Sequence, residues 1–389
     1  MTDIDSGRFA TLLHAYGRAT DTPGHLAALA DGDTASRNAA LGHLWSAVIH
    51  QGTPWTATPP AAAAVAALVG DPRLSGAADA ALRADLLCFL AAVAESGRSS
   101  PELADLADPA GVDVDAALVA ALDAGDEDEV FADEVLANAL YARAVLGCRA
   151  VVPTVLDAAT AALSDPAPAV RAAAAHTVSA CRPALTAPTG TATLAGRLDA
   201  LAAGAGPDER AALVLAMGEL GLAPRTYLDD PHPGVRACAA LAPALADDPV
   251  ATTEILTALA DPAATDDWFT QRPPQIHTRI RFALVAAAVA RVDDPDRLLP
   301  AALAVAPIAS PYTVGGDWGA LLRALFAGRT DDPLSPAQRR YLGALVDNAG
   351  LWDSRNGSVG LAFRDAGLPH DRAACHALVT DSAPGPPPR

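Results

Sequence analysis

An internal repeat is the feature that most constrains how this chain can fold. Three segments align with one another, and in each an Asp precedes an Arg by six residues: Asp31 and Arg37, Asp165 and Arg171, and Asp230 and Arg236. Gly or Pro follows each Asp, which predicts a turn, because Pro cannot continue a helix and Gly tolerates turn dihedrals. Apolar residues at helical spacing follow each Arg. The repeating unit is therefore predicted to be a helix, a turn and a second helix.

Helix pairs of this kind cannot bury their apolar faces alone, so they stack along a shared core. The clearest copies lie near residues 23–52, 152–181, 224–246 and 250–292, and weaker pairs are expected at 59–70 with 75–96, 112–124 with 128–147 and 191–204 with 207–221. About a quarter of the chain is Ala, the strongest helix former, and the sequence carries no strand pattern. We predict one all-α array over residues 1–380 and a disordered Pro-rich tail at 381–389.

The turn sequence resembles that of the HEAT-repeat family. Residues 165–171 and 230–236 carry the resemblance best, because Asp-Pro leads into Val-Arg in both. His-Gln-Gly-Thr at 50–53 and Gly-Leu-Pro at 367–369 are also similar to segments of a group of actinobacterial HEAT-repeat proteins. The resemblance implies a right-handed α-α superhelix, a solenoid of about eight to nine helix pairs with a degenerate C-terminal cap. It also implies that the Asp and Arg residues of the three copies form a structural ladder along the inner helices.

The charge balance bears on the kind of partner. The chain carries 46 acidic residues against 27 basic ones, all of them Arg, for a net charge of −19. Nucleic-acid binding without sequence preference depends on basic side chains that neutralise phosphates, so this balance argues against a nucleic-acid partner. It favours a basic protein partner instead. The oligomeric state is left open.

The sequence also bears on the compartment. Charges or prolines interrupt every apolar stretch before about 18 residues, so no membrane span is predicted. The first eight residues lack the basic and apolar regions of a secretory signal. The cysteines form no Cys-x-x-Cys pair and lie mostly in apolar helical stretches, which predicts small core residues in a reducing compartment. We therefore expect a cytoplasmic protein.

The helix predicted over residues 35–50 offers the first candidate binding surface. His43, Ser46 and His50 fall on one of its faces, opposite an apolar stripe of Leu41, Leu44, Trp45 and Val48. Gln51 and Trp55 lie beside His50 in the sequence, and we include both as binding candidates. The alternative is a helix whose exposed side merely carries polar residues. His43 and His50 would lie about 10 Å apart on a helix, so they predict no metal site.

An insertion supplies the second group of candidates. Asp261-Pro262 opens another repeat, but the matching Arg281 follows after twenty residues instead of six. Long connections in compact repeats are usually functional, and Trp and Arg are common interface anchors. The candidates in and after residues 263–276 are Asp267, Trp268, Phe269, Arg272 and Arg279. The alternative is that the aromatic residues fold back over a shallow core.

Asp317 and Trp318 form a further candidate pair. They follow a glycine-containing turn and precede a helix predicted over residues 319–326. The first interpretation of Asp317 is a helix N-cap, and that of Trp318 is a core residue. A binding role for this pair is the second interpretation.

Catalytic motifs are not found. A Walker motif requires Lys, and residues 357–360 lack the spacing of a nucleophile elbow. We therefore assign no catalytic residue, no metal and no cofactor. The leading hypothesis is a non-catalytic interaction scaffold, of a regulatory or immunity type, that grips a protein partner on a concave surface. The alternative is a HEAT-like enzyme, a DNA glycosylase or a tailoring lyase with an Asp- and Trp-lined groove. An Arg-lined channel around Arg37, Arg171, Arg236, Arg279 and Arg281 would favour that alternative.

Overall fold

The computed structural model describes residues 6–98, 102–124, 130, 132–184, 188–328, 333–352 and 357–380. Helices make up nearly all of the regular structure in these ranges. The strands form two antiparallel pairs of two residues each, β1 with β2 and β3 with β4. The predicted all-α class is confirmed. The tail at 381–389, predicted to be disordered, lies outside the described residues.

The chain divides into two compact units, Met1–Leu220 and Gly221–Arg389. Unit 1 contains α1 (Ser6–Phe9), β1 (Leu13–His14), β2 (Gly17–Arg18), α2 (Thr22–Asp31), α3 (Thr34–His43), η1 (Leu44–Val48), β3 (Ile49–His50), β4 (Thr53–Pro54), α4 (Thr58–Val69), η2 (Pro72–Leu74), η3 (Ala77–Asp79), α5 (Ala80–Ser96), α6 (Glu102–Ala107), α7 (Val114–Ala124), α9 (Glu134–Ala162), α10 (Pro168–Ala180), η4 (Arg182–Ala184), α11 (Pro188–Gly204) and α12 (Pro207–Glu219). Unit 2 contains η5 (Arg225–Asp229), α13 (Pro233–Ala240), η6 (Pro243–Leu245), α14 (Pro249–Ala258), α15 (Pro262–Asp266), α16 (Ile280–Arg291), α17 (Pro295–Val305), η7 (Ala306–Ile308), α18 (Trp318–Leu325), α19 (Pro336–Asp347), α20 (Ala349–Trp352), α21 (Gly357–Asp365) and α22 (Arg372–Thr380). The single array predicted over residues 1–380 stays a prediction.

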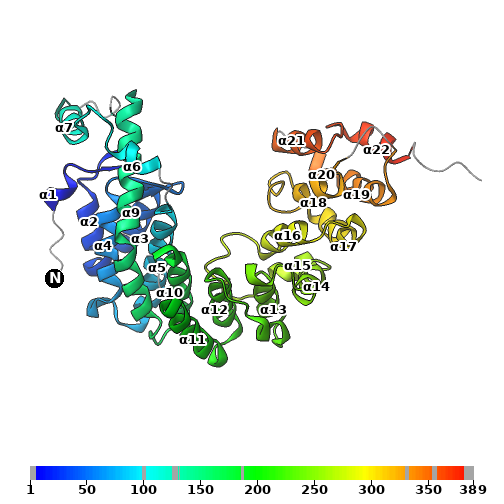
Figure 1. The fold of residues 1–389 in the computed structure, drawn as a ribbon, viewed down its shortest axis with the longest axis horizontal. Helices are drawn as coiled ribbons and strands as arrows, with labels where there is room; N and C mark the ends of the chain where they lie inside the picture. Colours follow the sequence, from blue (N-terminus) through cyan, green and yellow to red (C-terminus); the bar gives the residue numbers. More distant parts are fainter. Residues whose placement is uncertain are drawn as a thin grey trace, which may run out of the picture. The chain divides into compact units, whose positions relative to one another are not determined.

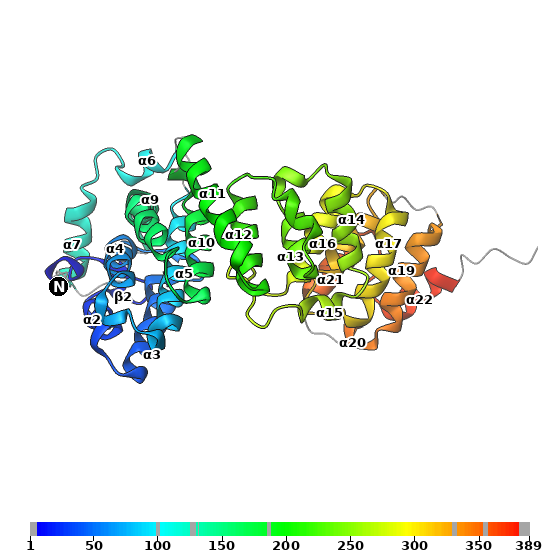
Figure 2. The ribbon, with the colours of Figure 1, turned by 90° about the horizontal axis from the view of Figure 1, so that it is seen from below.

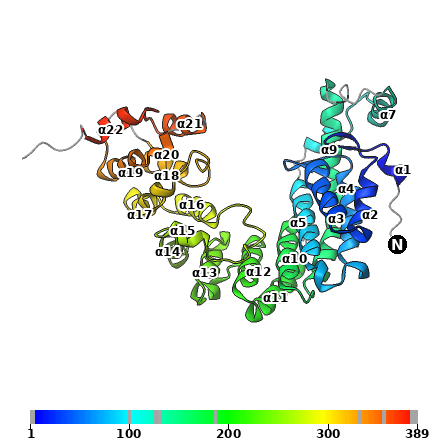
Figure 3. The ribbon, with the colours of Figure 1, turned by 180° about the vertical axis from the view of Figure 1, so that it is seen from behind.

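Helix α9 is the central helix of unit 1. It runs beside α4 and α5 (Figure 1), and α6 and α10 also pack against it. Seen from behind in Figure 3, α2, α3 and α4 lie beside one another, and α10 is a neighbour of both α5 and α12. By length and composition alone α9 could cross a membrane, and within unit 1 it packs against α4, α5, α6 and α10. The absence of a membrane span stays a prediction.

The continuity of α9 corrects one predicted boundary. The sequence pattern separates a helix at 128–147 from a repeat that starts near 152, whereas α9 runs unbroken through Pro153. A proline inside a helix costs about 3 kcal/mol, because it removes one hydrogen bond and crowds the preceding turn. Val145, Cys148, Val152 and Val155 are all buried on one side of α9. The burial of this stripe offsets the cost of the proline.

Unit 2 is also built of short helices that follow one another in chain order. α13 packs against α14, α14 against α16, and α17 against both α18 and α19; Figure 2 labels α13, α14, α16, α17 and α19. Trp318, Tyr341 and Phe363 are the largest fully buried side chains of this unit. The rings of Trp318 and Phe363 lie 5.8 Å apart between centroids. The core of unit 2 therefore rests on a few aromatic residues among many small ones.

An arginine at the fourth position of six helices ties each helix to the turn before it. These residues are Arg37 in α3, Arg83 in α5, Arg171 in α10, Arg210 in α12, Arg236 in α13 and Arg339 in α19. Each donates to backbone carbonyl groups five to nine residues earlier in the chain. In the repeats at 165 and 230, the carbonyl belongs to the Asp itself. The spacing of six residues thus places the guanidinium group of each Arg within hydrogen-bond distance of the Asp carbonyl.

The ladder side chains other than that of Asp230 form ion pairs with residues outside their own copy. Arg37 contacts Asp79 at 2.7 Å, Arg171 contacts Glu209 at 2.6 Å, and Arg236 contacts Glu254 at 2.9 Å. The carboxylates of Asp31 and Asp165 contact Arg73 at 2.7 Å and Arg83 at 2.9 Å. The Asp230 carboxylate accepts the backbone N–H of His232 at 2.8 Å. Each ion pair thus joins one helix pair to another segment of its unit.

The helix predicted over residues 35–50 ends early. α3 ends at His43, a π-helical turn η1 covers Leu44–Val48, and strand β3 begins at Ile49. A π-turn inserts an extra residue per turn and rotates the side chains that follow it. His43, which ends α3, is only 8% exposed, while Trp45, which lies in the π-turn, is 43% exposed. The predicted common face of His43, Ser46 and His50 is wrong, and so is the predicted burial of Trp45.

Candidate functional site

A tight turn at Gln51 and Gly52 connects β3 to β4 in unit 1. Their φ angles are 50° and 82°, as in the type I′ turn that joins two-residue hairpins. Among the residues that the structure describes, Gln51 is the one non-glycine residue with a positive φ. Asn or Gly is the usual residue at this position, and another side chain costs about 1 kcal/mol or more. Strain of this kind at an exposed turn suggests a functional role.

The turn forms one wall of a pocket of about 400 Å³. Its lining consists of Trp45, Ile49, Gln51, Gly52, Ala92, Glu95 and Ser96. The Trp45 ring meets the buried Phe89 ring edge-on, with centroids 5.8 Å apart, and keeps part of its surface in solvent. The Ser96 hydroxyl donates to the Ala92 carbonyl at 2.8 Å and lies 3.5 Å from the Gly52 carbonyl. The end of α5 is thereby joined to the turn.

The accessible side of α5 carries two acidic residues, of which Glu95 lines this pocket. Asp85, Cys88, Ala92 and Glu95 recur at helical spacing and are exposed or half-buried. Burial raises the pKa of the Asp85 carboxyl above its usual value. Burial, with the Asp85 charge as a smaller cause, raises the pKa of the Cys88 thiol to about 12. The thiol is therefore protonated at neutral pH and is not a nucleophile.

Glu219, the last residue of α12, adds a second carboxyl group close to Glu95. The Ser179 hydroxyl donates to its carboxylate, and Arg182 donates to its backbone carbonyl at 3.2 Å. Desolvation by the surrounding protein raises the pKa of Glu219 to about 7, and repulsion by Glu95 acts in the same direction. The hydrogen bond from Ser179 and the charge of Arg98 oppose this rise. The negative charges of Glu95 and Glu219 therefore repel each other at this end of the helices.

The arrangement is suited to binding a cation. Carboxylates form charge-assisted hydrogen bonds with Arg and Lys, and the face of an indole ring attracts a positive charge. A bound cation would also relieve the repulsion between Glu95 and Glu219. Trp45, Gln51 and Glu95 line the cavity, and we call them, together with Glu219, whose charge interacts with that of Glu95, the acidic pocket.

The structure separates the four candidates predicted near residue 50. Gln51 lines the acidic pocket. His50, half-buried, donates from Nδ1 to the Ser46 carbonyl at 2.8 Å and meets the Tyr16 ring edge-on at 5.7 Å. Trp55 is half-buried beyond the turn, and its backbone N–H donates to the Thr58 hydroxyl at 2.8 Å. His43 is buried elsewhere, in a cluster with His14 and Asp21.

The candidates of the insertion lie in unit 2, in the segment between α15 and α16. Phe269 is 8% exposed and packs on Gly234 and His232, where any side chain larger than a hydrogen at Gly234 would collide with its ring. This is the arrangement in which the aromatic residue covers the core. Trp268 is half-buried, and Asp267 and Arg272 are exposed. A binding role for these three stays a prediction.

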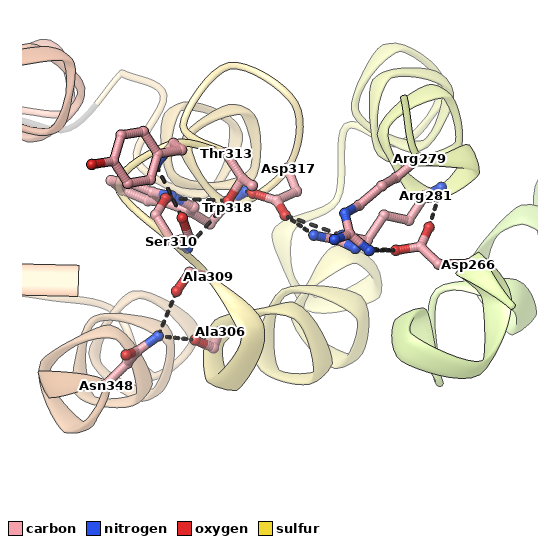
Figure 4. A network of polar contacts seen from close by, with 11 residues as sticks. Asp266, Arg279, Arg281, Ala306, Ala309, Ser310, Thr313, Asp317, Trp318 and Asn348 are labelled. Carbon is pink, nitrogen blue, oxygen red and sulfur yellow. Dashed lines mark hydrogen bonds and ion pairs between the residues drawn. The ribbon is translucent and has the colours of Figure 1, made fainter. Parts of the chain in front are cut away.

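Arg281 lies between two buried carboxylates in unit 2 (Figure 4). It contacts Asp266 on one side and Asp317 on the other, with its Nε 3.1 Å from Asp317 Oδ2. Asp317 also accepts the Trp318 backbone N–H at 2.6 Å and so caps α18. Burial raises the pKa of Asp317, although the Arg281 charge opposes the rise. Arg279 contacts Asp266 from the exposed side at 3.2 Å.

Trp318 is part of the same buried network. Its ring N–H donates to the Ser310 carbonyl at 2.9 Å, and its own carbonyl accepts the Tyr341 hydroxyl at 2.9 Å. Both Asp317 and Trp318 have 0% exposure. Asp317 is therefore the N-cap of α18 and Trp318 is a core residue, and neither side chain is accessible to a partner. The same figure shows the Asn348 amide, which donates to the Ala306 and Ala309 carbonyls.

The arginines proposed for an enzyme channel are all ion-paired. Arg37, Arg171 and Arg236 contact the acidic residues given above, and Arg279 and Arg281 contact Asp266. A phosphate would have to displace these carboxylates. At these five residues the structure offers no Arg-lined channel.

Sequence reasoning missed three members of the acidic pocket. Trp45 was assigned to the core, because the π-turn after His43 has no clear sequence signal. Glu95 could have been found from the polar face of the helix predicted over 75–96. Glu219 comes close to Glu95 only through the packing of α5, α10 and α12, which no local pattern reveals. Comparisons with protein families, curated proteins and solved structures found no match, so these residues are interpreted from their own geometry.

Proposed function

We propose that this chain is a non-catalytic interaction protein, and that the acidic pocket of unit 1 binds a basic segment of a partner protein. The observation that carries the proposal is the exposed Trp45 beside Glu95 under the strained Gln51 turn. Such a pocket would hold an Arg or Lys side chain between a carboxylate and an aromatic face. The net charge of −19 would speed the approach of a basic partner.

The architecture is part of the proposal. We describe the chain as a HEAT-like, right-handed α-α superhelix of about eight to nine helix pairs, closed by a degenerate C-terminal cap. The recurrence of an arginine that ties the fourth position of a helix to the turn before it supports a common repeat in both units. All five cysteines are free, which supports the cytoplasmic location that we propose.

The enzymatic alternative gains no observation in its favour from the described residues. Asp317 and Trp318, which would line its groove, are buried in the core of unit 2. The arginines that would contact a nucleic acid are held by carboxylates. A glycosylase or lyase is therefore not proposed.

Site-specific photo-crosslinking tests the proposal. A photoreactive residue is placed at Gln51 in the full chain, and the protein is exposed to an extract of its native cells. The control carries the same residue at Tyr312, which is 89% exposed in unit 2. We expect a partner adduct at Gln51 that is absent at Tyr312 and that maps to a basic segment of the partner.

A charge variant sharpens this test. In the protein that carries the photoreactive residue at Gln51, the additional substitution Glu95→Arg should abolish the adduct, because the pocket would then repel a cation. An adduct that persists with Glu95→Arg, or one that maps to an acidic segment, would contradict the proposal. The lack of any adduct at Gln51 would contradict it as well.

A further inference from the structure

Three potential metal ligands from separate elements meet in unit 1. His14 lies on β1, Asp21 directly precedes α2, and His43 ends α3. His14 Nε2 lies 3.0 Å from Asp21 Oδ1, and His43 Nδ1 lies 3.9 Å from Asp21 Oδ2. The ligand atoms of all three residues lie within 4.8 Å of one another. Both histidines are buried, whereas the Asp21 side chain is 55% exposed.

We propose that His14, Asp21 and His43 bind a divalent late first-row transition metal ion such as Zn²⁺. Two imidazole nitrogens and one carboxylate oxygen form a donor set that suits Zn²⁺ and its neighbours in the series. Mg²⁺ and Ca²⁺ prefer oxygen ligands and are disfavoured here. Because Asp21 faces solvent, the ion would keep at least one open coordination position. This inference does not rest on the proposed function.

The distances require only a small contraction. Ligand atoms on a tetrahedral Zn²⁺ lie about 3.3 Å apart, as follows from bond lengths of about 2.0 Å. The separation of 3.0 Å between His14 and Asp21 is already close to this value. The longest separation, at most 4.8 Å, must shorten by about 1.5 Å. Rotation of the exposed Asp21 side chain and of the His43 ring can supply this change.

His43 is prepared for ligation by its surroundings. Its ring is 8% exposed, and its Nδ1 lies 3.9 Å from Asp21 Oδ2. A metal on Nδ1 places the ring proton on Nε2, and the Thr22 hydroxyl lies 2.9 Å from that atom to accept it. Metal-bound histidines usually have such a partner for their second nitrogen.

His14 needs one rearrangement. Its Nδ1 accepts the Tyr16 backbone N–H at 3.1 Å, so its proton lies on Nε2 and points to Asp21. A metal on Nε2 would move the proton to Nδ1, and the Tyr16 N–H would have to turn away. Tyr16 lies in the turn between β1 and β2 and is 67% exposed. The loss of this local hydrogen bond would weaken binding by about tenfold, which an ion with three ligands can tolerate.

A bound ion would connect three elements of the N-terminal region. It would tie the β1–β2 hairpin to the start of α2 and the end of α3. Tyr16 contacts both His14 and His50, with ring centroids 6.2 Å and 5.7 Å away. His50 directly precedes the Gln51 turn, so the ion would also steady the segment that carries the acidic pocket.

Titration of the full, untagged chain with Co²⁺ tests the inference, because Co²⁺ replaces Zn²⁺ and absorbs visible light when bound by nitrogen ligands. We expect one Co²⁺ per chain, displacement by one Zn²⁺, and no competition from Mg²⁺. Asp21→Asn keeps an oxygen that accepts from His14 but removes the charged ligand, so it should weaken binding at least about tenfold. His43→Ala should weaken it at least about 100-fold.

His25→Ala is the matched control. His25 stacks on His43 with ring centroids 4.2 Å apart but is not one of the three ligands, so its loss should change Co²⁺ affinity by less than about threefold. Zn²⁺ should raise the melting temperature of the wild type and of His25→Ala, but not that of Asp21→Asn. Folding of each variant without metal is checked by circular dichroism. No saturable Co²⁺ spectrum in the wild type would overturn the inference, and so would equal affinity in Asp21→Asn.

Discussion

At the scale of single residues, Gln51 combines an unfavourable backbone conformation with a place in the acidic pocket. Gln51→Asn should stabilise the protein by about 0.5 to 1 kcal/mol, because Asn tolerates a positive φ better than Gln does. Urea unfolding measures the change. Gly52→Ala is the comparison: its added Cβ would meet no atom within 4 Å, so the φ of 82° alone should cost about 1 kcal/mol. If Gln51→Asn lowered stability instead, the strain assigned to Gln51 would be wrong.

Arg281 is the residue on which the buried network of unit 2 depends. Arg281→Ala leaves the carboxylates of Asp266 and Asp317 without their buried partner and should destabilise the protein by about 3 kcal/mol or more. Arg279→Ala, which removes a side chain that is 56% exposed from the same Asp266, should cost less than about 1 kcal/mol. Denaturant unfolding compares the two. Equal losses would mean that burial does not decide the contribution of these ion pairs.

The pKa of Glu219 makes stability depend on pH. Its folded value, about 7, exceeds the usual value of 4.5, so the folded protein binds more protons between these values. Stability contributed by the protonated carboxyl is therefore lost as the pH rises from 4.5 to 7. Glu219 keeps part of its surface in solvent although its carboxyl group is desolvated, so screening limits the effect to about 1 kcal/mol or less.

Glu219→Gln keeps an acceptor for Ser179 and removes the titration. Its melting temperature should exceed that of the wild type by about 2 °C at pH 8, with a smaller difference at pH 5. Thermal unfolding at the two pH values provides the measurement. A difference that is the same at both would show that Glu219 titrates normally.

At the scale of helices and turns, the arginine at the fourth helical position holds successive segments together. The side chain of Arg83 is 4% exposed, donates to the Leu74 and Gly76 carbonyls and contacts Asp165. Arg83→Ala should therefore cost about 3 kcal/mol, because carbonyl groups and a carboxylate lose their partner together. Arg73→Ala is the control, since this arginine also contacts two carboxylates but has a side chain that is 42% exposed. Arg73→Ala should cost less than about 1 kcal/mol, and a larger loss there than for Arg83→Ala would contradict this account.

Most helices could be predicted from the sequence, because their signals are local. The start of α10 at Pro168 and of α12 at Pro207 follows from proline and helical spacing. The continuity of α9 through Pro153 could not be predicted, because the burial of its apolar side chains outweighs the tendency of proline to end a helix. The exposed Trp45 follows from a π-turn without a sequence signature. The two groups that we interpret as sites depend on the proximity of distant segments: the charges of Glu95 and Glu219 interact, and His14 lies beside Asp21 and His43.

At the scale of the whole molecule, the chain consists of two compact units, and each unit has its own group of polar residues. Unit 1 carries the acidic pocket and the histidine cluster, whereas unit 2 carries the Arg281 network. The candidate residues that stay exposed in unit 2 are Asp267, Arg272 and Arg279, and Arg279 is paired with Asp266. We therefore propose recognition by unit 1, and unit 2 is available as a control region in binding experiments.

The central claim is that the acidic pocket binds a cation presented by a partner protein. Calorimetric titration of the partner captured at Gln51 into wild-type protein and Glu95→Gln tests this claim most directly. A charge-assisted hydrogen bond contributes about 1.5 to 3 kcal/mol, so the account predicts at least about tenfold weaker binding to Glu95→Gln, with Tyr312→Ala unchanged. Equal affinity for wild type and Glu95→Gln would contradict it.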